Sequence, residues 1–62
     1  MQNNVEKMRK LRDLSQEQLG EALGVSRQTI ISIEKGKYNP SLDLAFRMAR
    51  FFETPIEEIF IY

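Results

Sequence analysis

Two residues, Gly24 and Val25, are all that separates two segments that carry the end signals of short helices. The first segment begins at Ser15 and the second at Ser26, and serine is a favoured residue at the N-cap of a helix. Each segment ends at a glycine, Gly24 or Gly36, the residue type that most easily adopts the left-handed turn after a helix. So short a connection leaves little freedom in how the two helices are arranged, and we expect Val25 to be the apolar residue that fills the turn.

The side chains of both segments repeat at helical spacing. The first segment, which also has the Ser15–Gln18 spacing of a capping box, has an apolar stripe formed by Leu19, Ala22 and Leu23. The second has one side that is apolar with a single acid, formed by Ile30, Ile33 and Glu34. Its other side carries amide, methyl, hydroxyl and ammonium groups, from Gln28, Ile31, Ser32 and Lys35.

An ordinary amphipathic surface helix would show the same two sides. Two helices joined by so tight a glycine-containing turn, however, match the helix-turn-helix motif. The polar groups on the outer side of the second helix are able to contact base edges and phosphates in a DNA major groove, which is wide enough to admit a helix. The pattern therefore favours DNA binding by the second helix.

Composition narrows the possible functions. The chain has 62 residues, so residues 1–62 are expected to form a single domain. It contains no cysteine and no histidine, which removes disulfides, thiolate metal sites and the commonest general base. Without a glycine-rich phosphate loop or a separated pair of inward carboxylates, an enzyme is disfavoured, and no cofactor, metal or small-molecule ligand is expected. No apolar run approaches the roughly 18 residues of a membrane span and no secretory signal is present, which predicts a cytoplasmic protein without a membrane partner.

Charge is unevenly distributed, although nine basic and nine acidic residues give a formal net charge of zero. A neutral chain argues mildly against nucleic acid, because proteins that bind it are usually basic overall. The second helix and the residues just after it, however, hold three bases against Glu34 alone, namely Arg27, Lys35 and Lys37. Residues 53–62 hold three glutamates and no base. The basic region thus coincides with the helix expected to contact DNA.

One further helix is expected on each side of the motif. The first runs from about Asn4, its N-cap, to Arg12, and its apolar stripe is formed by Val5, Met8 and Leu11. The other begins at Ser41, its cap, and continues to about Phe52. Its inward stripe is formed by Leu42, Ala45, Met48, Ala49 and Phe52.

A last short helix is expected near the C-terminus. Thr54 has the position of its cap, Pro55 that of the first helical residue, and Glu57 that of the partner in a capping box. The helix is expected to reach about Phe60. The tail that follows is apolar and β-prone.

Several residues stand at fixed spacings, namely Arg9, residues 14–19, residues 23–30, residues 33–36 and residues 39–42. The match to which they belong extends over roughly residues 5–60 and needs no gap. This pattern resembles the helix-turn-helix domain of the phage Cro and CI repressors, also called the xenobiotic-response-element family. Within that family the chain is most similar to short stand-alone regulators. The resemblance implies an all-α fold, a compact lambda-repressor-like bundle of five short helices, and operator binding as a dimer.

The resemblance also implies roles for individual residues. The arginine and the acid that match Arg9 and Glu34 form a buried ion pair, and the glutamine that matches Gln16 contacts a phosphate. The helix at about residues 26–35 lies in the major groove, and its base contacts fall on Arg27, Gln28, Thr29 and Ser32. Contacts with the DNA backbone fall on Lys35, Lys37 and Asn39.

One residue departs from the family pattern. The family usually has alanine where this chain has Gly20. Glycine weakens a helix by roughly 1 kcal/mol, and since both residues would allow close helix packing, the departure is expected to affect stability and not function.

The C-terminal segment is more apolar than one small core requires. An exposed apolar cluster usually marks an interface, so we expect a homodimer that uses Ile56, Phe60, Ile61 and Tyr62. The other interpretation is that these side chains all close the core and the tail folds back beside Met1–Val5 as a short strand pair.

The function expected from the sequence is a small transcriptional regulator, with repression as its effect, that binds double-stranded DNA sequence-specifically. A two-fold dimer would place two copies of the base-contacting helix one DNA turn apart on a pseudo-palindromic operator. The competing function is an antitoxin or adaptor whose main role is to bind a protein partner through the C-terminal apolar surface.

Overall fold

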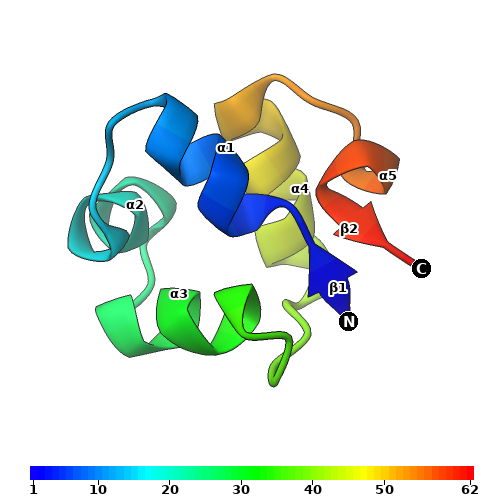
Figure 1. Ribbon diagram of the computed structural model, residues 1–62, viewed down its shortest axis with the longest axis horizontal. Coiled ribbons are helices and arrows are strands. Elements are labelled where there is room, and N and C mark those ends of the chain that lie inside the picture. The colour runs from blue at the N-terminus through cyan, green and yellow to red at the C-terminus, as the bar shows by residue number, and fades with distance from the viewer.

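Five short helices and one pair of two-residue strands make up the fold (Figure 1). The computed structural model describes residues 1–62. The elements follow in the order β1 (Gln2–Asn3), α1 (Val5–Leu11), α2 (Gln16–Leu23), α3 (Arg27–Glu34), α4 (Leu42–Phe52), α5 (Ile56–Ile59) and β2 (Phe60–Ile61). The expected bundle of five helices is confirmed. The longest helix, α4, has 11 residues, and none is both long and apolar enough to cross a membrane.

The serines that precede α2, α3 and α4 cap these helices as predicted. Ser15 accepts a hydrogen bond from the backbone N–H of Gln18 at 3.0 Å, and the Gln18 side chain accepts one from the N–H of Ser15 at 2.8 Å, which completes the capping box. Ser26 and Ser41 each accept a bond of 3.1 Å from the backbone N–H three residues further on. Gly24 has φ = +75°, the left-handed conformation expected after α2. Because these signals are local, α2, α3 and α4 begin where the sequence indicates.

Asn4 occupies the N-cap position of α1, as predicted, but its side chain does not cap the helix. The side chain of Asn4 makes no capping bond, because its Nδ2 donates to the carbonyl of Glu58 at 3.0 Å. The N–H of Val5 donates instead to Oδ1 of Asn3, at 3.1 Å. The strand pair brings Asn4 next to α5, so the residue before it takes over the capping of α1.

The last helix differs from the prediction at its start. The Thr54 hydroxyl donates to the carbonyl of Phe52 at 2.9 Å, so it closes the end of α4 and does not cap α5. Pro55 occupies the N-cap position, and no side chain, including that of Glu57, forms a cap there. The helix stops at Ile59, since Phe60 adopts an extended conformation and enters β2.

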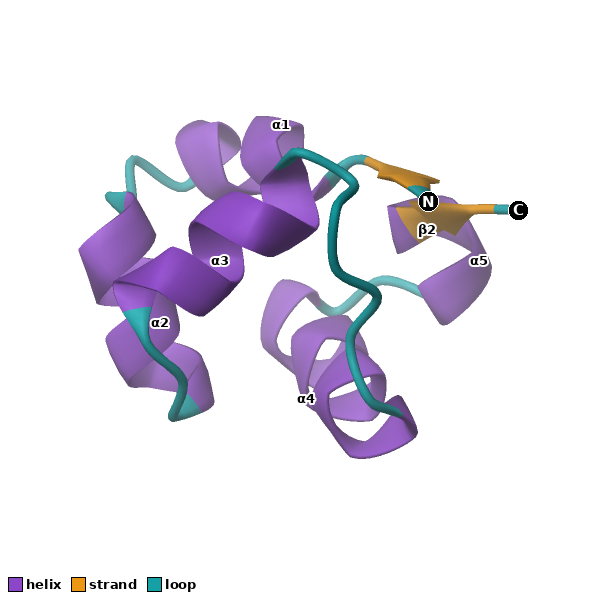
Figure 2. Cartoon of the chain, turned by 90° about the horizontal axis from the view of Figure 1, so that it is seen from below, coloured by secondary structure: helices purple, strands orange, loops and turns teal.

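The two strands join the ends of the chain. They run antiparallel, with Gln2 opposite Ile61 and Asn3 opposite Phe60. A bond of 2.8 Å from the N–H of Asn4 to the carbonyl of Ile59 continues the pairing toward α5. Both termini therefore lie on the same side of the molecule, beside α5 (Figures 1 and 2). A strand pair in which the C-terminal tail folds back beside Met1–Val5 is one of the two arrangements considered from the sequence, and the structure contains it.

One apolar core fills the space between the helices. Its 11 buried side chains are Val5, Leu19, Leu23, Ile30, Ile33, Leu44, Ala45, Met48, Phe52, Ile59 and Phe60. Three residues assigned to inward stripes are exposed instead, namely Leu11 at 75%, Leu42 at 70%, and Ala22. Leu11 follows the buried Val5 by six residues, which is about 240° around a helix, so it points to solvent. Leu42 lies about 100° from the buried side of α4 for the same reason.

Candidate DNA-binding interface

Helices α2 and α3 approach each other more closely than alanine would allow. Gly20 is buried on α2, and a Cβ built on it would lie 2.7 Å from the backbone oxygen of Val25 in the turn. Cβ atoms essentially never come within 3.0 Å of such a neighbour, and a backbone carbonyl cannot rotate away as a side chain does. The expectation that alanine would also allow this close packing is therefore wrong. Gly20 helps to set the position of α3.

One side of α3 is anchored in the core and the other faces solvent. Ile30 and Ile33 are fully buried. Figure 2 shows α3 on the near face of the molecule, where no other element covers it. Arg27 and Gln28, two of the predicted base-contacting residues, are exposed at its N-terminal end.

The other two predicted base-contacting residues, Thr29 and Ser32, are half-buried. The hydroxyl of Thr29 lies 2.9 Å from that of Ser26, which also caps the helix. Two hydroxyls joined by one hydrogen bond use only one of their two hydrogens, so one donor remains for an outside acceptor. Thr29 is thus held at the start of α3, while Ser32 lies one turn further along the helix.

The residues predicted to contact the DNA backbone lie at two places near α3. Lys35, Lys37 and Asn39 are exposed in and around the loop that follows the helix. Gln16 begins α2, is half-buried, and donates from Nε2 to Oε1 of Glu34 at 3.1 Å. Since an amide nitrogen carries two hydrogens, this bond leaves Gln16 one donor for a phosphate oxygen.

The predicted ion pair between Arg9 and Glu34 is present and buried. Nε of Arg9 lies 2.7 Å from Oε2 of Glu34, and the two side chains are 9% and 5% exposed. A second bond of 3.3 Å joins Nη2 to Oε1, and Nη1 donates to the carbonyl of Leu14 at 2.7 Å. The hydrogen bond to Glu34 raises the pKa of Arg9 above its ordinary value, against the opposing effect of burial. Together with the bond from Gln16, this pair joins α1, α2 and α3.

Two further side chains hold the motif in place, and sequence reasoning missed both. Arg47 of α4 donates from Nη1 to the carbonyl of Leu23 at the end of α2, and its Nη2 lies 3.0 Å from Asp43. The four-residue spacing of Asp43 and Arg47 is a recognised signal for a pair on one helix, but it does not indicate the bond to α2. Asn3 of β1 donates to the carbonyl of Ile33 at the end of α3, at 2.8 Å, and no sequence signal points to that contact.

The apolar surface predicted for a dimer is only partly exposed. Ile61 is 48% exposed and Tyr62 is fully exposed, whereas Ile56 is half-buried. Phe60 is 8% exposed and belongs to the core, so the prediction that its ring is available for an interface is wrong. The ring is needed to close the small bundle beneath β2. An adjoining hollow of about 320 Å³ is lined mainly by apolar side chains, including Leu42 and Ile56.

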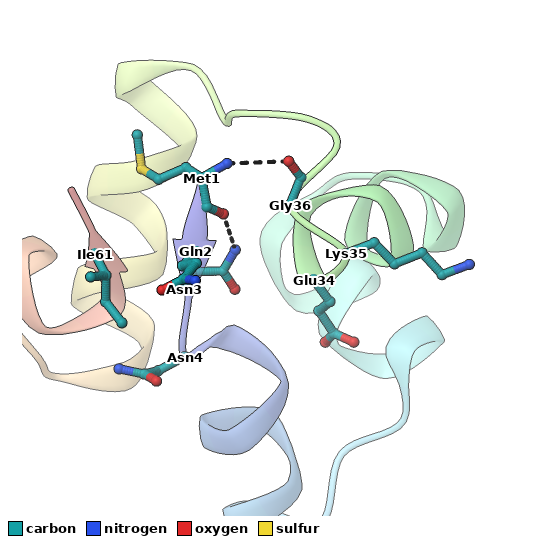
Figure 3. A pocket seen from close by; sticks show the side chains of 8 residues that line it. All are labelled: Met1, Gln2, Asn3, Asn4, Glu34, Lys35, Gly36 and Ile61. Carbon is teal, nitrogen blue, oxygen red and sulfur yellow. Dashed lines mark hydrogen bonds between the residues drawn. The ribbon is translucent and has the colours of Figure 1, made fainter.

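No group of three or more acidic, histidine or cysteine side chains is placed to hold a metal ion. The largest hollow in the surface, of about 510 Å³, lies between the N-terminal segment and the end of α3 (Figure 3). Most of its lining residues are polar, among them Gln2, Asn4 and Lys35.

Known proteins share both the sequence pattern and the fold. The family described as Helix-turn-helix matches residues 5–59. An uncharacterised HTH-type transcriptional regulator of Methanocaldococcus jannaschii is 61% identical over 62 residues, which are the whole of this chain and 94% of that protein. The cryptic phage CTXphi transcriptional repressor RstR of Vibrio cholerae is 33% identical over 57 residues, covering 92% of this chain and 51% of that protein.

A solved structure has a similar fold. The restriction-modification controller protein C.AhdI from Aeromonas hydrophila has a TM-score of 0.81 at 28% identity, covering 92% of this chain and 86% of that one. The resemblance to Cro- and CI-type regulators is therefore confirmed by sequence and by structure. The chain belongs to the helix-turn-helix family of DNA-binding transcriptional regulators.

Proposed function

We propose that this protein represses transcription by binding a pseudo-palindromic operator in double-stranded DNA as a homodimer. The observation that carries the proposal is the two-sided character of α3, whose Ile30 and Ile33 are fully buried while Arg27 and Gln28 are exposed. A helix held by one side and free on the other fits the major groove. The relative from Vibrio cholerae that is named a transcriptional repressor supports repression as the effect. In this proposal the protein acts in the cytoplasm and catalyses no reaction.

The exposed residues of α3 supply the contacts with base edges. The amide of Gln28 is suited to a bidentate contact with N6 and N7 of adenine. The guanidinium of Arg27 is suited to O6 and N7 of guanine, or to a phosphate. Thr29 and Ser32 have shorter side chains, so their hydroxyls add contacts only where α3 lies deep in the groove.

Residues around the two ends of the motif supply the phosphate contacts. Lys35, Lys37 and Asn39 follow α3, and Gln16 approaches the same region through its bond with Glu34. Contacts of this kind fix the register of a protein on the duplex and provide much of its affinity, whereas base contacts determine the sequence preference. The neutral net charge of the chain does not oppose this division, because the bases near α3 outnumber the acids there.

The size of the molecule supports a dimer. Successive major-groove faces on one side of DNA lie about 34 Å apart, whereas the longest extent of this protein is 25 Å. One copy is therefore too small to contact both half-sites of a palindrome. Exposed apolar groups next to the strand pair, Ile61 and Tyr62 above all, offer a surface that a second copy would cover.

Selection of bound duplexes from a random pool, followed by sequencing, tests the proposed DNA specificity. Two half-sites related by two-fold symmetry are expected. Gln28→Ala is then titrated against the selected duplex and a random one, and a loss of about 1–3 kcal/mol is expected on the selected duplex with little loss on the other. A pool without enrichment would refute sequence-specific binding, and equal losses on both duplexes would remove Gln28 from the base contacts.

Sedimentation equilibrium tests the dimer. Ile61→Glu places a charge in the proposed interface and is expected to yield monomers. Leu11→Glu is the matched control, since Leu11 is 75% exposed on α1, away from the strand pair. A monomeric wild type would refute the dimer, and a folded Ile61→Glu variant that remains dimeric would place the interface elsewhere.

A further inference from the structure

The carboxyl end of α3 is in direct contact with β1. Nδ2 of Asn3 donates to the carbonyl of Ile33 at 2.8 Å, across 30 residues of sequence, and to the carbonyl of Met1 at 3.2 Å. Oδ1 of the same side chain accepts the N–H of Val5. Figure 3 shows Asn3 on the N-terminal strand, beside the end of α3. One amide group therefore connects three backbone segments, namely β1, the start of α1 and the last turn of α3.

A second set of contacts joins Met1 to Gly36, just after the end of α3. The backbone nitrogen of Met1 donates to the carbonyl of Gly36 at 3.2 Å (Figure 3). Gly36 has φ = +75°, and a Cβ built on it would lie 3.2 Å from the carbonyl oxygen of Met1. A larger residue would meet both backbone strain and this close neighbour. Both ends of segment 33–36, Ile33 and Gly36, are thus held against the N-terminal residues.

The carbonyl that Asn3 binds belongs to the last turn of α3. This turn leads into the loop around Lys35, Lys37 and Asn39, the phosphate-contacting loop of the proposed function. The last four carbonyls of a helix lack helical partners. The carbonyl of Ile33 accepts the N–H of Gly36 at 2.9 Å, and the bond from Asn3 occupies its second acceptor position. Lys35 and Lys37 follow within four residues. Any shift of this turn would therefore move both lysine side chains relative to DNA.

We infer that Asn3 is a positioning residue for DNA binding, which fixes the end of α3 and with it the approach of Lys35 and Lys37 to the phosphate backbone. This inference rests on the proposed function. Asn3 lies in register with Phe60, so the same strand pair that carries the exposed Ile61 also holds the end of α3. The position of the phosphate-contacting loop is in this way tied to the terminal strands as well as to the helical core.

Serine substitutions separate this role from the capping of α1. Asn3→Ser keeps a hydroxyl oxygen for the N–H of Val5, but its side chain is too short to reach Ile33, and it adds no charge. Asn4→Ser is the matched control, because the Asn4 amide donates to Glu58 on α5 and makes no bond to α3. Each variant is titrated with the selected duplex at several salt concentrations.

Asn3→Ser is expected to weaken binding roughly three- to tenfold, the effect of removing one hydrogen bond. It should also flatten the slope of log K against log salt by about one unit for each phosphate that the protein no longer neutralises, whereas Asn4→Ser should leave the slope unchanged. A purely structural role would lower the folded fraction without changing the slope. The slope therefore distinguishes positioning from stability.

A variant cycle covers the case in which Asn3→Ser is poorly folded. Adding Asn3→Ser to a Lys35→Ala, Lys37→Ala background should cause no further change in slope, because the lysines that Asn3 positions are already absent. Equal slopes for Asn3→Ser, Asn4→Ser and wild type, or a further flattening in the double-lysine background, would overturn the inference. If wild type itself selects no duplex, the proposed function fails instead.

Discussion

Gly20→Ala is a substitution for which sequence and structure predict opposite results. On helix propensity alone, alanine in place of glycine should stabilise α2 by roughly 1 kcal/mol. In the structure, however, the new Cβ would lie 2.7 Å from the backbone oxygen of Val25 and 3.3 Å from backbone atoms of Ser26. The neighbours belong to the turn between α2 and α3, so relief of the contact has to move α3.

The cost of the contact exceeds the gain in propensity. Adding a methyl group to a tightly packed site costs about 1–3 kcal/mol in shifted side chains and backbone, and we take about 2 kcal/mol as the cost here. The N–H of Val25 is already bonded to the carbonyl of Gly20 at 2.9 Å, which restricts the direction of any shift. A net destabilisation of about 1 kcal/mol follows from the two opposing effects. For a domain of this size, that corresponds to a decrease in Tm of roughly 4–8 °C.

Urea and thermal denaturation of Gly20→Ala measure the net effect. Ala22→Gly is the control, because Ala22 is exposed on the same helix and its replacement changes propensity without changing packing. The control should lose about 1 kcal/mol. If Gly20→Ala instead raised the free energy of unfolding by about as much, the approach of α2 and α3 would be easily adjusted and the packing argument would be refuted.

Three further predictions concern stability and DNA binding. Arg9→Met should lower the free energy of unfolding by about 3–5 kcal/mol, since it leaves Glu34 buried without its partner; a denaturation midpoint close to that of wild type would contradict this. Lys35→Ala and Lys37→Ala should each weaken binding to all duplexes and flatten the salt dependence by about one unit, and unchanged slopes in both would exclude these lysines from the phosphate contacts. Glu53→Gly should raise the free energy of unfolding by about 1 kcal/mol, because Glu53 has φ = +53° at the end of α4; thermal denaturation showing no gain would mean that the left-handed conformation costs little there.

The parts of the fold that were predictable from sequence depend on contacts between near neighbours. Ser15, Ser26 and Ser41 each bond to an N–H three residues away, so residue type and spacing were sufficient to place three helix starts. Gly24 gave one helix end for the same reason. Where a long-range contact competes, the local signal gave the position but not the bond: Asn4 is at the N-cap of α1, but its side chain bonds to Glu58 and not to the helix.

The candidate site likewise contains features that the sequence predicts and features that it does not. The exposed positions of Arg27 and Gln28 follow from helical periodicity once α3 is placed. The contacts of Arg47 and Asn3 with the ends of α2 and α3 span 24 and 30 residues, and neither side chain shows a periodic or capping signal for them. The close approach at Gly20 was also hidden, since glycine and alanine are both small and only the geometry separates them.

These long-range contacts explain how so short a helix acquires a defined position. α3 has eight residues, whereas isolated helices shorter than about 12–15 residues are marginal in water. Burial of its two isoleucines attaches α3 to the core, but apolar contact has no preferred direction and tolerates rotation of the helix about its axis. Hydrogen bonds are directional, so the bonds from Arg9 to Glu34 and from Asn3 to Ile33 limit that rotation at the last turn, while Gly20 limits movement at the first. Core substitutions should therefore act mainly on stability, whereas substitutions at the polar contacts should act on how Gln28 and the lysines meet DNA.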